Sequence, residues 1–300
     1  MRTRLPRLPE VPERFPAPFR TLLHEVLARG PALPGDREDR LRARRAALSQ
    51  SGTFVGHRPY VRGDDLRGID WAAFARSGEM YCKQLEEEER RTATLWLDLS
   101  PRLLVGSPPR RLAALRLAAV VGGLALRHLD GLTVFAPGAG ARTTAMFAGG
   151  HDLDRLLAHL DALPVVAVPP SDAIAPMLRS ALGRVHWISD FADPAACEQP
   201  LAALRRRGGK VTGWLPAIEE DAQAPRRGYV QVADPATGEV FAVAIDRDLA
   251  AELQRQLETL RRRQDRLFAQ CGCPLVRWPA PRQDDFAWRS YQEIAFQCSR

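Results

Sequence analysis

Two aspartates that follow apolar runs are the first residues whose types and spacing could do chemistry. Asp98 comes directly after the run 94–97, and Asp190 closes the run 185–188 with one serine between. The carboxyl ends of parallel strands meet at one edge of an open α/β sheet, and ligands bind there. We therefore expect the two carboxylates to lie close together, in a site for an ion or for a polar group of a partner.

The residues around these aspartates both favour and oppose a metal ion. Ser100 and Ser171 could add hydroxyl ligands, and oxygen ligands suit a magnesium-type ion. A guanidinium about 4 Å from a divalent ion is repelled by about 8 kcal/mol at an effective dielectric constant of about 20. Because Arg102 stands beside Ser100, we expect its side chain to pair with Asp98 and Asp190 in place of the ion, so no cofactor is expected. The alternative is a magnesium ion held by Asp98, Ser100 and Asp190.

A second candidate site is a segment rich in arginine and aspartate near the N-terminus. Its members are Arg58, Tyr60, Gly63, Asp64, Asp65, Arg67, Asp70, Trp71 and Arg76. We expect a structural belt of ion pairs that pins this segment to the sheet, with a turn at Gly63 and a packed Trp71. The alternative is a partner-recognition surface or an anion pocket, because forked guanidiniums favour carboxylate and phosphate groups.

The elements that must position these residues alternate from residue 92 onward. The predicted strands are 94–97, 132–136, 185–188 and 210–215, and the predicted helices are 111–128, 152–163, 172–182 and 194–207. This alternation is typical of an α/β fold with a doubly wound, mostly parallel sheet of the Rossmann type. We expect a hairpin of 229–232 and 239–243 at the sheet edge, a helix at 246–270, and irregular structure over 271–300.

The composition divides the chain into four predicted parts. Residues 1–50 form an N-terminal arm with helices at 19–29 and 36–48, and 51–91 form a charged signature subdomain. Residues 92–245 form the sheet domain, and 246–300 form a C-terminal helix and tail. The candidate residues therefore fall in two different parts of the chain.

Two ordered motifs carry a resemblance to known families. The first is Gly56-x-Arg58-x-Tyr60-x-x-Gly63-Asp64-Asp65-x-Arg67-x-Ile69-Asp70-Trp71. It resembles the signature of the bacterial family called domain of unknown function 58. The second is Asp98-x-Ser100, Ser171-Asp172 and Ile188-Ser189-Asp190. It resembles the metal-ion-dependent adhesion site of von Willebrand A domains, in a degenerate form.

The departures from the adhesion-site pattern affect what the resemblance implies. Arg102 stands where that pattern has its second serine, and Ser171 stands where it usually has threonine. The resemblance implies a von Willebrand A-like domain that binds a protein partner. For members of the first family, it implies an accessory role beside a MoxR-type AAA+ ATPase, in chaperone-like assembly or maturation of other complexes.

The basic composition raises the question of nucleic-acid binding. The formal net charge is +7, and arginine triplets occur at 205–207 and 261–263. No aromatic residues are interleaved with them, as a base-stacking platform would require, so we expect solvated helix faces. A nucleic-acid-binding protein that uses these clusters is the alternative.

The sequence lacks common catalytic and targeting motifs, so we expect a non-catalytic cytoplasmic protein. The sequence has no His-Glu-x-x-His motif, no phosphate loop and no Gly-x-Ser-x-Gly motif, so we expect no enzyme activity. The alternative is a metal-dependent hydrolase that uses Asp98 and Asp190. Five scattered cysteines predict reduced thiols. No apolar run reaches the roughly 20 residues of a membrane span, and residues 1–20 lack the apolar core of a secretory signal.

Overall fold

The chain folds as two compact units. The computed structural model describes residues 13–29, 53–62, 64, 66–86, 92–106, 110–128, 131–140, 143–164, 183–218, 221, 227–234, 237 and 239–279. One unit is Pro34–Arg90, and the other combines Met1–Leu33 with Arg91–Arg300. The predicted parts 92–245 and 246–300 therefore belong to one unit, together with the N-terminal helix.

A six-stranded sheet forms the centre of the larger unit. Its strands are β3 (Thr92–Leu97), β4 (Gly131–Phe135), β5 (Thr144–Phe147), β6 (Arg184–Ile188), β7 (Lys210–Ala217) and β10 (Leu275–Pro279), in the order β10-β7-β6-β3-β4-β5. All neighbours are parallel except β4 and β5. The predicted mostly parallel sheet is confirmed. The order reverses between β3 and β6, because the chain first builds outward through β4 and then returns to the other side of β3.

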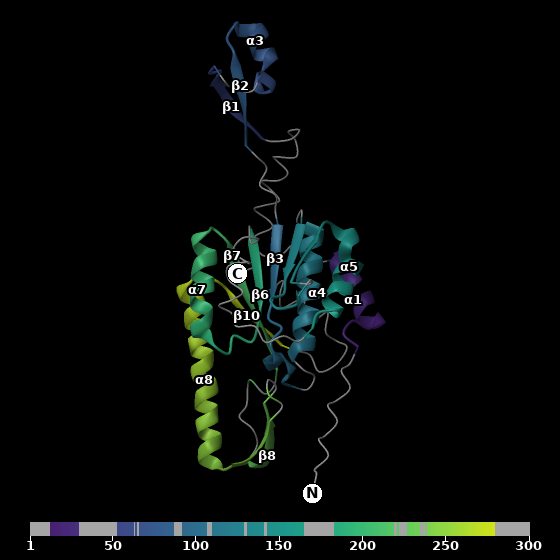
Figure 1. The fold of residues 1–300 in the computed structure, drawn as a ribbon, viewed down its shortest axis with the longest axis vertical. Coiled ribbons are helices and arrows are strands. Elements are labelled where there is room, and N and C mark those ends of the chain that lie inside the picture. Colours follow the sequence, from purple (N-terminus) through teal and green to yellow (C-terminus); the bar gives the residue numbers. More distant parts are fainter. Residues whose placement is uncertain are drawn as a thin grey trace. The chain divides into compact units, whose positions relative to one another are not determined.

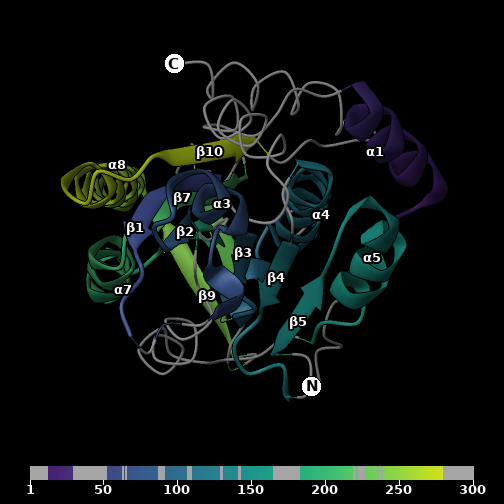
Figure 2. The ribbon, with the colours of Figure 1, turned by 90° about the horizontal axis from the view of Figure 1, so that it is seen from above.

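Helices cover both faces of this sheet. One face carries α1 (Ala17–Arg29), α4 (Arg110–His128) and α5 (Leu153–Asp161), and the other carries α7 (Pro194–Arg206) and α8 (Arg247–Gln270) (Figure 2). Figure 1 shows β3 and β6 between α4 on one side and α7 on the other. Side chains of a strand alternate between the two faces. Leu95 and Leu97 accordingly join the core beside α4, whereas Trp96 joins the core beside α7.

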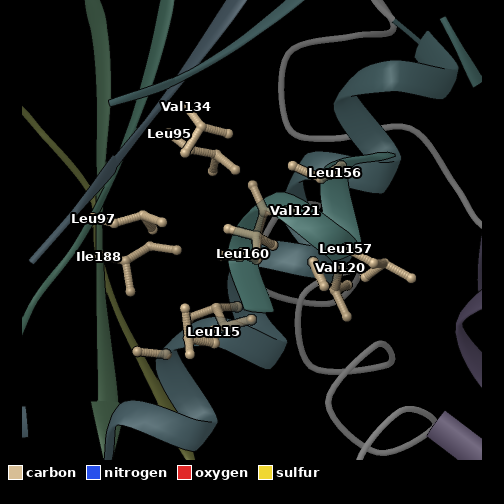
Figure 3. Packing of buried hydrophobic residues seen from close by; sticks show 14 of the residues in the cluster. Leu95, Leu97, Leu115, Val120, Val121, Val134, Leu156, Leu157, Leu160 and Ile188 are labelled. Atoms are coloured by element: carbon tan, nitrogen blue, oxygen red, sulfur yellow. The ribbon is translucent and has the colours of Figure 1, made fainter. Parts of the chain in front are cut away.

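The core beside α4 is closely packed. Figure 3 shows Leu95, Leu97 and Ile188 of the sheet facing aliphatic side chains of α4 and α5. A Cβ atom at Gly122 of α4 would lie 2.8 Å from Leu156 Cδ2, so the absence of a side chain there permits the contact. The apolar run that contains this glycine lies in the helix predicted at 111–128, and most of its side chains are buried. Among the described residues, no helix is both long and apolar enough to cross a membrane.

Two sequence expectations need correction in the larger unit, and one strand was missed. The tail expected to be irregular contains β10, which pairs in parallel with β7 and buries Trp278. The hairpin of β8 (Gly228–Ala233) and β9 (Val240–Ile245) forms a separate two-stranded sheet, because β10 takes the edge place beside β7. Strand β5 was not expected at all. The helices predicted at 36–48 and 172–182 lie outside the described residues.

The smaller unit is a hairpin with a short helix inserted between its strands. Strand β1 (Thr53–Pro59) pairs antiparallel with β2 (Tyr81–Glu86), and η1 (Leu66–Gly68) and α3 (Trp71–Ser77) connect them. The Asp70 carboxylate caps α3 by accepting hydrogen bonds from the backbone N–H groups of Ala72 and Ala73 at 3.0 and 3.1 Å. Gly78 ends the helix with a φ of +73°, which glycine adopts without strain.

Candidate functional site

Asp98 and Asp190 meet at the carboxyl edge of the sheet, where the strand order reverses. Leu97 of β3 is paired with Ile188 of β6, and the backbone N–H of Asp98 donates to the carbonyl of Ile188 at 3.0 Å. The loops that follow β3 and β6 therefore lie side by side at the carboxyl edge of the sheet. The predicted proximity of these aspartates is confirmed, because one side chain contacts both.

Arg102 is the side chain that joins the two carboxylates. It lies in η2 (Pro101–Leu104), where its Nε donates to Asp190 Oδ2 at 3.2 Å and its Nη2 lies 3.8 Å from Asp98 Oδ2. The Arg102 side chain is 47% exposed, whereas that of Asp190 is 4% exposed. The guanidinium thus covers the two carboxylates from the solvent side, in the arrangement that the sequence predicted.

Hydrogen bonds fix the Asp98 carboxylate in this arrangement. Oδ1 accepts from the backbone N–H of Ser100 at 2.8 Å, and Oδ2 accepts from Ser189 Oγ at 2.8 Å. Ser100 Oγ is buried and has no hydrogen-bond partner among the described residues. Ser171 lies outside the described residues. Ser189 was not a predicted site residue, although its position between Ile188 and Asp190 could have indicated it.

The loop after β6 is held in a strained conformation by α8. Phe191 has a φ of +48°, which is uncommon for a residue with a side chain. The buried amide of Gln264 in α8 donates to the carbonyls of Asp190 and Phe191, both at 3.1 Å. Asp190 Oδ1 also accepts from the backbone N–H of Ala192 at 3.0 Å. This loop is therefore positioned by a helix more than 70 residues away in sequence.

A second ion pair lies behind Asp190. Arg110, at the start of α4, places Nη1 4.0 Å from Asp190 Oδ2 and donates through Nη2 to Asp221. Asp221 in turn accepts from the backbone N–H of Ile218 at 3.0 Å, and its carbonyl accepts from Arg261 at 2.6 Å. Sequence analysis missed Arg110 and Asp221, because they are far apart in sequence and belong to no motif. The charges of Arg110 and Asp221 neutralise each other, whereas the Arg102 side chain is exposed to solvent.

A small cavity of about 80 Å³ adjoins the cluster. Its walls include Trp96 and Trp187, whose rings stack with centroids 3.9 Å apart, and Cys197. A cavity of this size holds a few water molecules rather than a cofactor. Burial raises the pKa of the Cys197 thiol to about 12, so the thiol stays protonated and is a poor nucleophile near neutral pH.

The described donors at this edge, apart from Ser100 Oγ, are engaged with one another. The Arg102 guanidinium lies beside both carboxylates, and Asp98 already accepts hydrogen bonds on both oxygens. Among the residues that the structure describes, no three His, Cys, Asp or Glu side chains gather as metal ligands. Mg²⁺ would have to compete with an internal cation for both aspartates.

The signature segment of the smaller unit contains one local ion pair and one local histidine–aspartate hydrogen bond. Arg58 donates to Asp64 through Nη1 and Nη2 at 2.6 and 2.8 Å, and this contact lowers the pKa of Asp64 to about 2. His57 Nε2 lies 2.9 Å from Asp70 Oδ2, and this hydrogen bond lowers the pKa of Asp70 to about 2. Gly63, Asp65 and the Arg67 side chain lie outside the described residues.

The aromatic residues of this segment lie in and beside α3. The Trp71 side chain is 60% exposed, and its packing in a belt against the sheet stays a prediction. Asp70 caps the N-terminus of α3, and Ala73 is the buried residue of this helix. Trp71 and Phe74 are exposed and contact each other, with ring centroids 6.2 Å apart. Tyr60 is half-buried, and its backbone N–H donates to the Met80 carbonyl at 2.9 Å. Arg76 is exposed and lies in the last turn of α3.

Comparison with solved structures finds two similar chains from Bacteroides. The conserved hypothetical protein BatB from Bacteroides thetaiotaomicron has a TM-score of 0.40 and 14% sequence identity, covering 70% of this chain and 100% of that chain. An aerotolerance-related membrane protein from Bacteroides fragilis has a TM-score of 0.37 and 15% identity, covering 69% of this chain and 99% of that chain.

Comparison with curated sequences finds mycobacterial relatives. Uncharacterized protein Mb1516 of Mycobacterium bovis and uncharacterized protein Rv1480 of Mycobacterium tuberculosis are each 27% identical to this chain over 241 residues. The alignments cover 73% of this chain and 72% of each relative. A family model described as "Protein of unknown function DUF58" matches residues 56–265, which include both candidate sites. The chain therefore belongs to the DUF58 family.

Proposed function

We propose that this protein is a non-catalytic binding module and an accessory partner of a MoxR-type AAA+ ATPase, in chaperone-like assembly or maturation of other complexes. In this proposal the larger unit is a doubly wound, von Willebrand A-like domain with a degenerate adhesion site, and the protein acts in the cytoplasm. Membership of the DUF58 family and the reversal of strand order at Asp98 and Asp190 support it.

The observation that carries the proposal is the orientation of Arg102. Nε and Nη2 face Asp190 and Asp98, whereas Nη1 has no hydrogen-bond partner among the described residues. The side chains of Asp98 and Asp190 are 16% and 4% exposed, so a partner meets the guanidinium before it meets either carboxylate. A guanidinium held in this way is preorganised to bind a carboxylate, and it lies where open α/β sheets bind their ligands.

Two features make the alternative functions less favourable. A metal-dependent hydrolase would need Asp98 and Asp190 to hold an ion, but the Arg102 guanidinium lies beside both carboxylates, and the buried Cys197 thiol stays protonated near neutral pH. A nucleic-acid surface would need free guanidiniums, and in the triplet 261–263 two of the three are engaged, since Arg261 donates to the Asp221 carbonyl and Arg262 pairs with Glu258. We therefore place the function in protein binding at the sheet edge.

The test is a pull-down with a MoxR-type AAA+ ATPase from the same organism. The native protein, Arg102→Glu and the control Arg262→Glu are each used as bait, and circular dichroism verifies that all three are folded. We expect Arg102→Glu to lose binding by about tenfold or more, because like charges at an interface cost several kcal/mol. Arg262→Glu changes an exposed charge on α8 and should bind like the native protein.

Two outcomes would contradict the proposal in different ways. Equal recovery by the native protein and Arg102→Glu would place the interface away from the carboxyl edge. Recovery by none of the three proteins would exclude this ATPase as the partner.

A further inference from the structure

The turn between α7 and β7 concentrates positive charge on the surface of the larger unit. We define the basic corner as Arg205, Arg206, Arg207 and Lys210. All four side chains are exposed, and none of them makes an ion pair with a residue in the described part of the chain. Residues 199–217 contain no aspartate or glutamate. The charge of the basic corner is therefore not balanced by its neighbours along the chain.

The basic corner lies at the amino edge of the sheet. Lys210 begins β7 and is the register partner of Arg184, which begins β6. Arg184 is in turn the register partner of Ala93 in β3. These three strands are parallel, so the basic corner and the aspartates Asp98 and Asp190 lie at opposite edges of the sheet. This surface is therefore separate from the Arg102 site.

Acidic residues that precede the neighbouring strands do not offset the basic corner. The chain that leads into β3 carries the four glutamates Glu86–Glu89 followed by Arg90 and Arg91, which is a net charge of −2 against four positive charges. Asp130, before β4, is matched in number by Arg127 at the end of α4. The sequence at this edge therefore keeps an excess of positive charge.

Hydrogen bonds hold the turn that carries the basic corner in one conformation. The backbone N–H of Gly208 donates to the Arg205 carbonyl at 2.9 Å, and that of Gly209 donates to the Leu204 carbonyl at 3.0 Å. This pair of bonds is the Schellman arrangement that ends many helices. Gly208 has a φ of +78°, and a Cβ atom there would meet no atom within 4 Å. The charges thus lie on a defined turn with open space beside it.

We propose that the basic corner binds the phosphate head groups of an anionic lipid surface. Forked guanidiniums pair well with phosphate groups, and clusters of about four to eight Lys or Arg residues are typical of protein segments that bind anionic lipids. Each cation near such a surface improves binding by about fivefold. This inference goes beyond the proposed function and does not require the ATPase to be the partner.

The surroundings of the basic corner favour a lipid surface over a protein or a nucleic acid. The apolar residues beside it, Leu201, Leu204 and Val211, are buried, so it lacks the exposed apolar core of a protein interface. Residues 205–210 contain no aromatic side chain for base stacking, and they form a helix end and a turn rather than an element that fills a DNA groove. Lipid head groups require only accessible positive charge.

The experiment measures sedimentation of the full chain with vesicles. One set of vesicles contains phosphatidylglycerol and phosphatidylcholine in equal parts, and the other contains phosphatidylcholine alone. We expect binding to the anionic vesicles to be about tenfold or more tighter than to the neutral ones. Raising the salt from about 0.1 M to about 1 M should weaken this binding, because the Debye length falls from about 10 Å to about 3 Å.

Variants with the same change in net charge locate the binding surface. Arg206→Glu/Arg207→Glu should weaken binding to the anionic vesicles by about 25-fold or more, because two attractive charges are lost. The matched control Arg255→Glu/Arg262→Glu reverses two exposed charges of α8 and should weaken binding by less than about threefold. Arg206→Lys/Arg207→Lys keeps the charge and should bind like the native protein. Circular dichroism verifies that every variant is folded.

Three outcomes would overturn this proposal. The first is that the native protein binds both kinds of vesicle equally or binds neither. The second is an equal loss of binding in the two charge-reversal variants, since vesicles would then respond only to net charge. The third is a labelled DNA duplex that binds through Arg206 and Arg207 more tightly than the vesicles at the same salt, which would make nucleic acid the partner. All variants keep Arg102, so failure of the ATPase pull-down leaves this result unaffected.

Discussion

The two arginine–aspartate clusters of this protein use the same chemical groups in different surroundings. Arg58 and Asp64 are six residues apart, and their side chains are 41% and 21% exposed. Arg102 and Asp190 are 88 residues apart, and the Asp190 side chain is 4% exposed. An exposed local pair contributes little to stability, whereas a buried carboxylate depends on its partner. We therefore expect burial, rather than residue type, to decide what each pair contributes to stability.

The tryptophans beside the two clusters also differ in how far they are buried. Trp96 is 2% exposed and stacks on Trp187, whereas Trp71 is 60% exposed. At the sheet edge, packed aromatic side chains therefore lie beside one exposed guanidinium. In the smaller unit, Trp71 and Phe74 are themselves exposed.

The largest expected effect comes from the two tryptophans. Trp96→Ala should lower the free energy of unfolding by about 3–5 kcal/mol, because it leaves a cavity in the core beside α7. Trp71→Ala should change it by less than about 0.5 kcal/mol, because the side chain is exposed. Urea unfolding measures both values. Similar losses of unfolding free energy in the two variants would contradict the expected difference between the buried and the exposed tryptophan.

A somewhat smaller loss is expected at Asp190. Asp190→Ala should destabilise the larger unit by about 3 kcal/mol, because Arg102 and Arg110 lose a buried partner. Asp193→Ala is the matched control, since it removes only the exposed carboxylate that caps α7 and should cost about 1 kcal/mol. Urea unfolding of both variants checks the difference, and a larger loss for Asp193→Ala would show that the cluster contributes little.

Magnesium tests whether Arg102 takes the place of an ion. Millimolar magnesium should leave the melting temperature of the native protein unchanged. Arg102→Ser removes the cation and adds a hydroxyl, so magnesium should then stabilise the folded state by about 1.4 kcal/mol at tenfold excess over Kd. Arg62→Ser, the same change in the other unit, should not respond. A magnesium-dependent rise in the native protein would contradict this interpretation.

The smallest effect is expected from the exposed pair at Asp64. Arg58 lowers the pKa of Asp64 to about 2, so the paired carboxylate contributes stability that is fully present above the ordinary carboxyl pKa of about 4 and lost as the pH falls toward 2. The difference in unfolding free energy between the native protein and Asp64→Asn should be constant above about pH 5 and shrink below it. Asp154→Asn, at an exposed carboxylate of α5, is the control. A difference that grows in acid would contradict the assignment.

The sequence by itself determined the alternation of strands and helices, the mostly parallel sheet and the placement of Asp98 and Asp190. Apolar runs with a strand-like length and segments with helical periodicity are local signals, and the carboxyl ends of parallel strands share one edge. The family signature and the local pairing partner of Arg58 also lie within a short stretch of chain. Such features need no knowledge of distant contacts.

Only the tertiary structure decided which distant side chains complete the site. Arg110 and Gln264 reach the Asp190 loop from two separate segments, Asp221 pairs with Arg110 from a third, and none of the three belongs to a sequence motif. Strand β10 was missed because an edge strand of five residues carries little periodicity, and its place beside β7 displaces the hairpin of β8 and β9. The exposure of Trp71 likewise depends on how Asp70 caps α3 and buries Ala73, which residue type alone does not specify. Burial and long-range pairing are properties of the packed chain, because they arise only when elements distant in sequence share a surface.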